Sequence, residues 1–213
     1  MKRVIVEHLR NSGYTITLID SVGVEQAAVS QTIDVMRAGS EIIVQGAFRA
    51  EGWGGRTDIL RRVDIPSDLG AWSYEVIDTK LARETKGGTV LQLCLYSDFV
   101  ASVQGIMPEF AYVVAPWSDY EPQRFRTNDY AAYYRHVKGG LNQALAGAPN
   151  SEDYPDPKEH CEICRWRLGC EARRRHDDHL CLVAGITKAH INELNRQNVL
   201  TTALSRRRRA CRH

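Results

Sequence analysis

Tyr74-Glu-Val-Ile-Asp-Thr-Lys80 is the stretch around which the rest of this sequence is organised. Its β-branched and aromatic residues favour a strand. Side chains alternate between the two faces of a strand, so Asp78 and Lys80 are expected to share one face, whereas Thr79 points to the other. One carboxylate and one ammonium group are therefore expected side by side.

A second stretch, Gly54-Gly-Arg-Thr-Asp-Ile-Leu60, suits a strand that is entered from a turn. If this strand lies beside the one that carries Asp78, the carboxylates of Asp58 and Asp78 converge. Hard divalent cations such as Mg²⁺ take oxygen ligands and are often held by one or two carboxylates together with water and substrate phosphate. A cation lowers the pKa of the water that it binds, and a lysine such as Lys80 can orient that water or stabilise charge on phosphorus.

A third stretch, Leu91-Gln-Leu-Cys-Leu-Tyr-Ser97, belongs to a predicted helix from about 89 to 104, which Gly105 ends. Gln92 and Tyr96 are four residues apart and so lie on one face of that helix. We expect this face to look back at the metal and the scissile phosphate.

An Asp-x-Lys pair alone is common and usually marks a solvated strand face. The ordered set Gly-x-x-Asp, Asp-x-Lys and Gln-x-x-x-Tyr is more specific. This set resembles the RecB-type branch of the PD-(D/E)xK nuclease superfamily. The sequences that carry the resemblance are Trp72-Ser-Tyr-Glu-Val-Ile-Asp-Thr-Lys-Leu-Ala82 and Gln92-Leu-Cys-Leu-Tyr96. The similarity is to one subgroup, the RecB-like nucleases that are often fused to a helicase, and it covers most of the chain.

The resemblance implies an α/β fold, with a restriction-endonuclease-like core in which helices flank a mixed central sheet. It also implies a nuclease, an exonuclease that hydrolyses DNA phosphodiester bonds in repair or recombination with Mg²⁺ or Mn²⁺. Asp58 and Asp78 would bind the metal, Lys80 would position water or stabilise the transition state, and Gln92 and Tyr96 would shape the site.

The partners implied are DNA, single-stranded or with free ends, and a helicase domain or protein. The family places an acidic helix and a cysteine upstream of Met1, so the core is expected to be N-terminally incomplete. Two other interpretations stay open: a non-cleaving DNA-binding module of a helicase–nuclease, and a structural iron–sulfur or zinc domain.

Composition places this sequence among ordinary globular domains. The 213 residues are 43% hydrophobic and 25% charged, with a net charge of only +2, so any basic surface must be local. No apolar run approaches the roughly 20 residues that span a bilayer, and the N-terminus lacks the apolar region of a secretory signal. A cytoplasmic protein without membrane contact is therefore the expectation.

Three of the six cysteines are clustered as Cys161-x-x-Cys164-x5-Cys170, a spacing typical of metal ligands. The alternative is that these cysteines are merely buried or incidental. The family resemblance implies an iron–sulfur cluster here, of the 4Fe–4S type, as in AddB and CRISPR-associated exonucleases, with an early cysteine as the fourth ligand. That cysteine is missing, and zinc is the alternative metal. Four side chains are candidates for the fourth ligand: Cys181, Cys94, Cys211 and His160.

The remaining pattern predicts a helix that ends near Ser12, strands over 14–20, 41–49 and 110–115, and helices over 24–37 and 130–145, the latter capped by Asn128. This order favours a mixed sheet with helices outside.

The prolines in Tyr154-Pro-Asp-Pro157 end the nuclease core, which is expected to span 1–153. A cysteine segment (154–180), a short unit of two helices (181–205) and a basic tail (206–213) are expected to follow. The two-helix unit is a little like a helix-hairpin-helix, which can present backbone amides to phosphate, but simple packing is the alternative.

Overall fold

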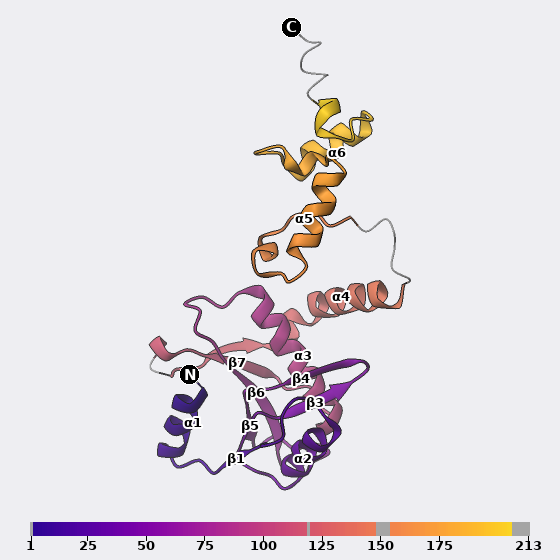
Figure 1. Cartoon of the computed structure of the whole chain (residues 1–213). Coiled ribbons are helices and arrows are strands. Elements are labelled where there is room, and N and C mark those ends of the chain that lie inside the picture. Colours follow the sequence, from indigo (N-terminus) through magenta and orange to yellow (C-terminus); the bar gives the residue numbers. More distant parts are fainter. Residues whose placement is uncertain (1, 119, 148–153, 206–213) are drawn as a thin grey trace. The chain divides into compact units, whose positions relative to one another are not determined.

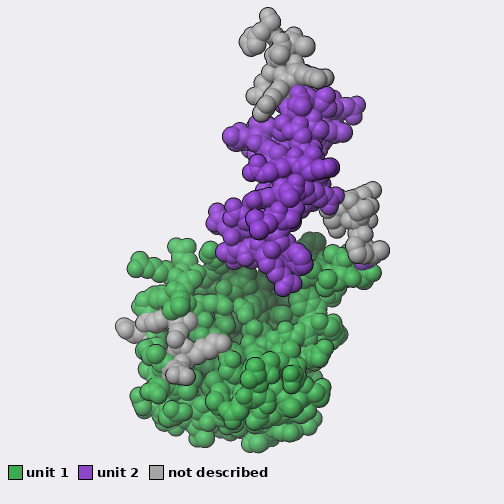
Figure 2. Space-filling view, viewed as in Figure 1, with its two compact units in different colours: residues 1–146 green, residues 147–213 purple. Residues whose placement is uncertain are grey.

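A six-stranded mixed sheet forms the centre of the N-terminal part of the chain (Figure 1). The computed structural model describes residues 2–118, 120–147 and 154–205, and the chain divides into unit 1 (1–146) and unit 2 (147–213), which Figure 2 colours separately. The strand order is β1-β2-β5-β6-β7-β8. Its strands are β1 (Ile16–Leu18), β2 (Ile42–Val44), β5 (Ile59–Val63), β6 (Ser73–Thr79), β7 (Phe110–Val114) and β8 (Gln123–Arg126).

The sheet mixes parallel and antiparallel pairs. β1 with β2 and β6 with β7 are parallel, whereas β5 is antiparallel to both β2 and β6, and β8 is antiparallel to β7. A separate hairpin pairs β3 (Ala47–Ala50) with β4 (Trp53–Arg56). The expected α/β class with a mixed central sheet and flanking helices is therefore confirmed.

Helices cover both faces of this sheet (Figure 1). The four helices of unit 1 are α1 (Lys2–Asn11), α2 (Gln26–Arg37), α3 (Gly87–Gln104) and α4 (Thr127–Ala146), and a short 3₁₀ turn, η1, spans Pro116–Ser118. On one face, Ile43 and Val76 pack in a core to which α2 and α3 contribute side chains such as Met36 and Leu93.

On the other face, Ile42 and Ile77 pack with Ile5 of α1. Neighbouring residues of β2 and β6 thus enter opposite cores, as the period of a strand requires.

Three local expectations were wrong. The stretch 54–60 is not one strand, because β4 ends at Arg56, β5 begins at Ile59, and Asp58 lies between them. The stretch 41–49 is not one strand, because Gln45 has a positive φ of 61° and sends the chain from β2 into the separate hairpin. Asn128 does not cap the next helix, since α4 already begins at Thr127, whose hydroxyl donates to the carbonyl oxygen of Pro108 at 2.6 Å.

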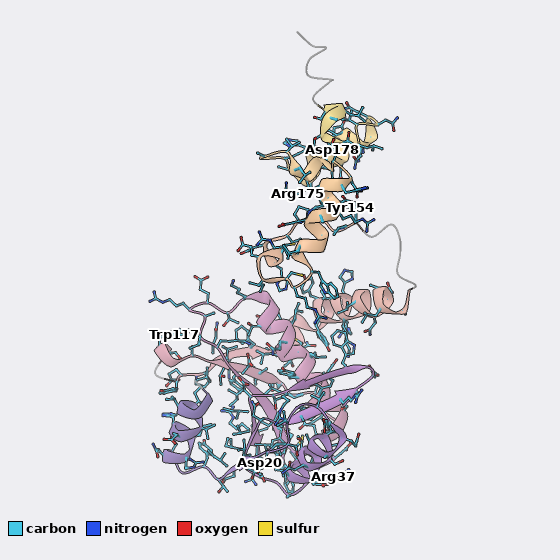
Figure 3. All side chains as sticks on the ribbon, viewed as in Figure 1. Asp20, Arg37, Trp117, Tyr154, Arg175 and Asp178 are labelled. Atoms are coloured by element: carbon cyan, nitrogen blue, oxygen red, sulfur yellow. The ribbon has the colours of Figure 1, made fainter. Side chains whose placement is uncertain are left out.

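Unit 2 contains η2 (Glu159–Ile163), α5 (Arg167–His176), η3 (Leu180–Leu182) and α6 (Lys188–Arg196). Leu180 and Val199 are buried. Asp178, labelled in Figure 3 together with Tyr154, accepts hydrogen bonds from the hydroxyl of Thr202 and from the backbone amide of Ala203. The cysteine segment and the helical segment after it therefore belong to one unit.

The expected basic tail, 206–213, with its Cys211, lies outside the described residues. Within the described part of the chain, no helix has the length and apolar character that crossing a membrane requires.

Candidate nuclease site

The end of β6 brings Asp78 and Lys80 together. The Lys80 ammonium lies 2.8 Å from Oδ2 of Asp78, and the Asp78 side chain is only 4% exposed. Lys80 itself follows the strand, and its amide donates to the carbonyl oxygen of Val114 at 3.1 Å, which extends the pairing of β6 with β7 by one residue. The shared face expected for these two side chains is thus realised as a direct ion pair.

Asp58 sits at the entrance to β5, next to the end of β6. Its Oδ2 accepts hydrogen bonds from the amide of Thr79 at 3.0 Å and from the hydroxyl of Thr79 at 2.5 Å. Asp58 directly precedes Ile59, which is paired with Ile77 in β6. The Asp58 carboxylate is therefore bonded to the residue between Asp78 and Lys80 in the chain, at the end of β6.

Gln45 fixes Asp58 from the other side. Its backbone amide donates to the carbonyl oxygen of Asp58 at 3.0 Å, and its side-chain amide lies 3.4 Å from Oδ1. The left-handed conformation of Gln45 therefore does two things: it ends β2 and it holds the acid of the neighbouring strand.

Helix α3 completes the set. Oε1 of Gln92 accepts from the Lys80 ammonium at 3.0 Å, and Nε2 of Gln92 donates to the Tyr96 hydroxyl at 2.9 Å. A continuous line of polar contacts thus runs from Asp78 through Lys80 and Gln92 to Tyr96. All five side chains expected from the sequence, Asp58, Asp78, Lys80, Gln92 and Tyr96, lie at this end of the sheet.

Arg56 is a contributor that sequence reasoning missed. Its guanidinium donates to four backbone carbonyl oxygens, those of Ile19 at 2.9 Å, Gln45 at 2.8 Å, Gly23 at 3.2 Å and Ser21. Arginine offers five donors in a fixed fork, so it can join separate chain segments in this way. Its place two residues before Asp58 is the only sequence signal, and that signal does not reveal which carbonyls it would meet.

The donor set of this site suits a hard cation. Asp58 and Asp78 are both buried to more than nine-tenths, and Asp78 forms an ion pair with Lys80. Carboxylate oxygens are the ligands that Mg²⁺ and Mn²⁺ prefer, and Mg²⁺ is often bound by only one or two of them. Asp58 and Asp78 are the residues that could hold such a cation.

The three clustered cysteines lie in unit 2. Cys161 is in η2, Cys164 is the first residue after η2, and Cys170 is in α5. All three are free thiols of intermediate exposure, and the amide of Lys158 donates to Sγ of Cys161 at 3.3 Å. Among the residues that the structure describes, no three His, Cys, Asp or Glu side chains are grouped so that they could hold one metal ion.

The candidates for a fourth ligand differ in their surroundings. Cys94 is buried in unit 1 between α3 and α4, and burial, together with the charge of Asp98, raises the pKa of its thiol. A raised pKa disfavours the thiolate that a metal requires. Cys181 and His160 are in unit 2 with the three clustered cysteines, and burial raises the pKa of the Cys181 thiol as well.

A comparison with protein-family models found no match for this chain, and a search of curated proteins found no relative. The functional argument therefore depends on the geometry of the site.

Proposed function

We propose that this chain is a metal-dependent DNA nuclease with a PD-(D/E)xK core, an exonuclease of DNA repair or recombination that acts on single strands or free ends. The observation that carries the proposal is the line of contacts from Asp78 through Lys80 and Gln92 to Tyr96, with Asp58 bonded to the intervening Thr79. Residues from three separate segments of the sequence meet there in the order that the nuclease motifs require.

A divalent cation held by Asp58 and Asp78 would supply Lewis-acid activation of the attacking water and of the scissile phosphate. The chain's own part is to position the groups around it. Thr79 holds the Asp58 carboxylate in one orientation with two hydrogen bonds to Oδ2. Such preorganisation is what a site for charge stabilisation requires.

Lys80 is the group that would act on the reacting atoms. Its ammonium group forms an ion pair with Asp78 at 2.8 Å and donates to Oε1 of Gln92 at 3.0 Å, which leaves donor capacity for a water or a phosphate oxygen. A cation at that place stabilises the negative charge that develops on a phosphate oxygen during in-line attack. Tyr96, through its hydroxyl, keeps the Gln92 amide in the orientation that accepts from Lys80.

The test is cleavage of end-labelled single-stranded DNA by the purified chain with Mg²⁺ or Mn²⁺, and with EDTA as the metal-free reference. Asp78→Asn preserves the size of the side chain but removes its charge, and loss of a cation ligand is expected to lower the rate by at least about a hundredfold. The exposed Asp34 on α2, changed to Asn, is the matched control because it only pairs with Arg37 on the surface. Equal rates for wild type and Asp78→Asn would reject the mechanism, and DNA binding without any cleavage would indicate a binding module.

A further inference from the structure

A groove of about 290 Å³ opens beside the candidate nuclease site, between the β3–β4 hairpin, α3 and α4. Its walls are almost entirely carbon and come from Trp53, Leu91, Leu95, Tyr134, Val137 and Leu141. Gln92 also lines it. Because the amide of Gln92 bonds to Lys80 and Tyr96, one residue connects the groove directly to the line of polar contacts that carries the proposed chemistry.

We propose that this apolar groove binds one unpaired nucleobase of the DNA strand whose phosphate is at Asp78 and Lys80. The inference rests on the proposed nuclease function and deepens it, since it assigns a place for a base beside the residues that would act on the phosphate. In a nucleotide the base and the phosphate are only a few bonds apart, so a strand bound at the site brings a base to its border. A volume of about 290 Å³ is at the lower end of the range for ligand pockets, which suits a ring system rather than a larger group.

The walls have the chemistry that a base requires. Trp53 supplies aromatic surface, and its indole N–H donates to Oδ1 of Asn142 at 2.9 Å, which fixes the orientation of the ring. Tyr134 also lines the groove but is largely buried. Every base has a π-face, so stacking on aromatic side chains is tolerant of sequence. An aromatic wall with a fixed ring therefore suits a nuclease that reads no sequence.

Charge in the groove is already compensated, which argues against a phosphate as its occupant. The ammonium group of Lys138 lies 3.0 Å from Oδ2 of Asp98 and 3.9 Å from Oε2 of Glu51. The groove is therefore suited to an uncharged planar group, while the backbone phosphate is left to Lys80.

A paired base cannot enter such a groove unless its pair opens, which has a free-energy cost for a duplex that a single strand does not incur. The groove consequently predicts that single strands and frayed ends bind more tightly than internal duplex.

Leu141 and Leu145 offer a matched pair for the test. Both are exposed on α4, one turn apart, but only Leu141 lines the groove. We would measure binding of a single-stranded oligonucleotide that carries 2-aminopurine and of the same sequence as a duplex, with Ca²⁺ in place of Mg²⁺ so that the strand is bound but not cut. Leu141→Ser is expected to weaken single-strand binding about fivefold and Trp53→Ala about tenfold, with little change for the duplex. Leu145→Ser should match wild type, and Trp53→Phe should retain most of the binding.

Equal single-strand affinity for wild type, Leu141→Ser and Trp53→Ala would overturn the base subsite. An equal loss of affinity for the single strand and the duplex would also overturn it. So would a wild-type dimer that Leu141→Ser dissociates, because the groove would then be an interface between two copies of the chain. Cleavage of DNA by wild type is measured in parallel. If wild type and the groove variants bind and cleave DNA equally well, the base subsite alone is rejected. If wild type neither binds nor cleaves DNA, the nuclease function is rejected as well.

Discussion

Gly55 illustrates how a single backbone position can control the candidate site. A Cβ atom built at this residue would lie 2.7 Å from Cε1 of Tyr96, a distance that real Cβ atoms essentially never show. Gly55 lies in the strand β4, where it pairs with Phe48. The absence of a side chain therefore lets the hairpin approach the helix that carries Gln92 and Tyr96.

Gly55→Ala is accordingly expected to displace the Tyr96 ring and to disturb its hydrogen bond to Gln92. Overpacking of this kind destabilises a domain by about 1–3 kcal/mol, which chemical denaturation measures, and the DNA cleavage rate should fall with it. Gly87→Ala in the first turn of α3 is the control, because a Cβ there meets nothing within 4 Å. Wild-type stability and activity for Gly55→Ala would show that Tyr96 can move without consequence.

At the scale of elements, α4 contains a pair of glycines that no contact requires. Gly139 and Gly140 are inside the helix, and a Cβ at either position would meet nothing within 4 Å. Glycine in a helix interior costs about 0.5–1 kcal/mol relative to alanine, because it gives up more conformational freedom on folding.

Gly139→Ala is therefore expected to raise the free energy of unfolding by about 0.5–1 kcal/mol, measured by urea denaturation. Gly13→Ala is a matched comparison, since a Cβ there is also unobstructed but its φ of +91° is left-handed. That second change should destabilise by roughly 1 kcal/mol. If both variants shift in the same direction, the helical account of Gly139 is wrong.

Periodicity predicted most of the individual elements of unit 1 but not their pairing. Helix α3 ends where glycine was expected to end it, and Gly105 has a φ of 76° at the C-cap. Strand β8 was missed because its polar sequence Gln-Arg-Phe-Arg carries no apolar alternation. The order of strands in the sheet depends on contacts between distant segments, which a local pattern does not encode.

The same distinction applies to the candidate site. The proximity of Asp78 to Lys80 and of Gln92 to Tyr96 follows from local spacing, so both pairs were predictable. The hydrogen bonds of Thr79 and Gln45 to Asp58 were not, because Thr79 was expected on the opposite face and Gln45 lies in a turn whose positive φ only the structure reveals. Hydrogen bonds between residues of different segments can be predicted only when the pairing of those segments is known.

At the scale of the whole molecule, unit 2 raises a separate question of stability. Ile163, Trp166 and Leu168 surround the clustered cysteines in the sequence, and all three are more than 60% exposed. A segment with so little apolar core of its own gains folding energy from metal ligation, because the site does not exist in the unfolded chain. Cys161, Cys164 and Cys170 are not grouped around a metal position in the described part of the chain. We propose that the three thiols converge when an iron–sulfur cluster binds, with zinc as the alternative metal.

Anaerobically purified protein should be brown, and Cys164→Ser should lose the visible absorption and become more sensitive to limited proteolysis within 154–180. Unit 1 has its own buried core, so its thermal unfolding should be unchanged in that variant. Asp78→Asn, which alters the other site, should keep the colour, and Cys181→Ser tests whether this thiol is the fourth ligand. Colourless protein with stoichiometric zinc would identify zinc as the metal. If the purified protein contains neither metal, and wild type and Cys164→Ser are cleaved by the protease at the same rate, metal ligation has no role in the stability of unit 2.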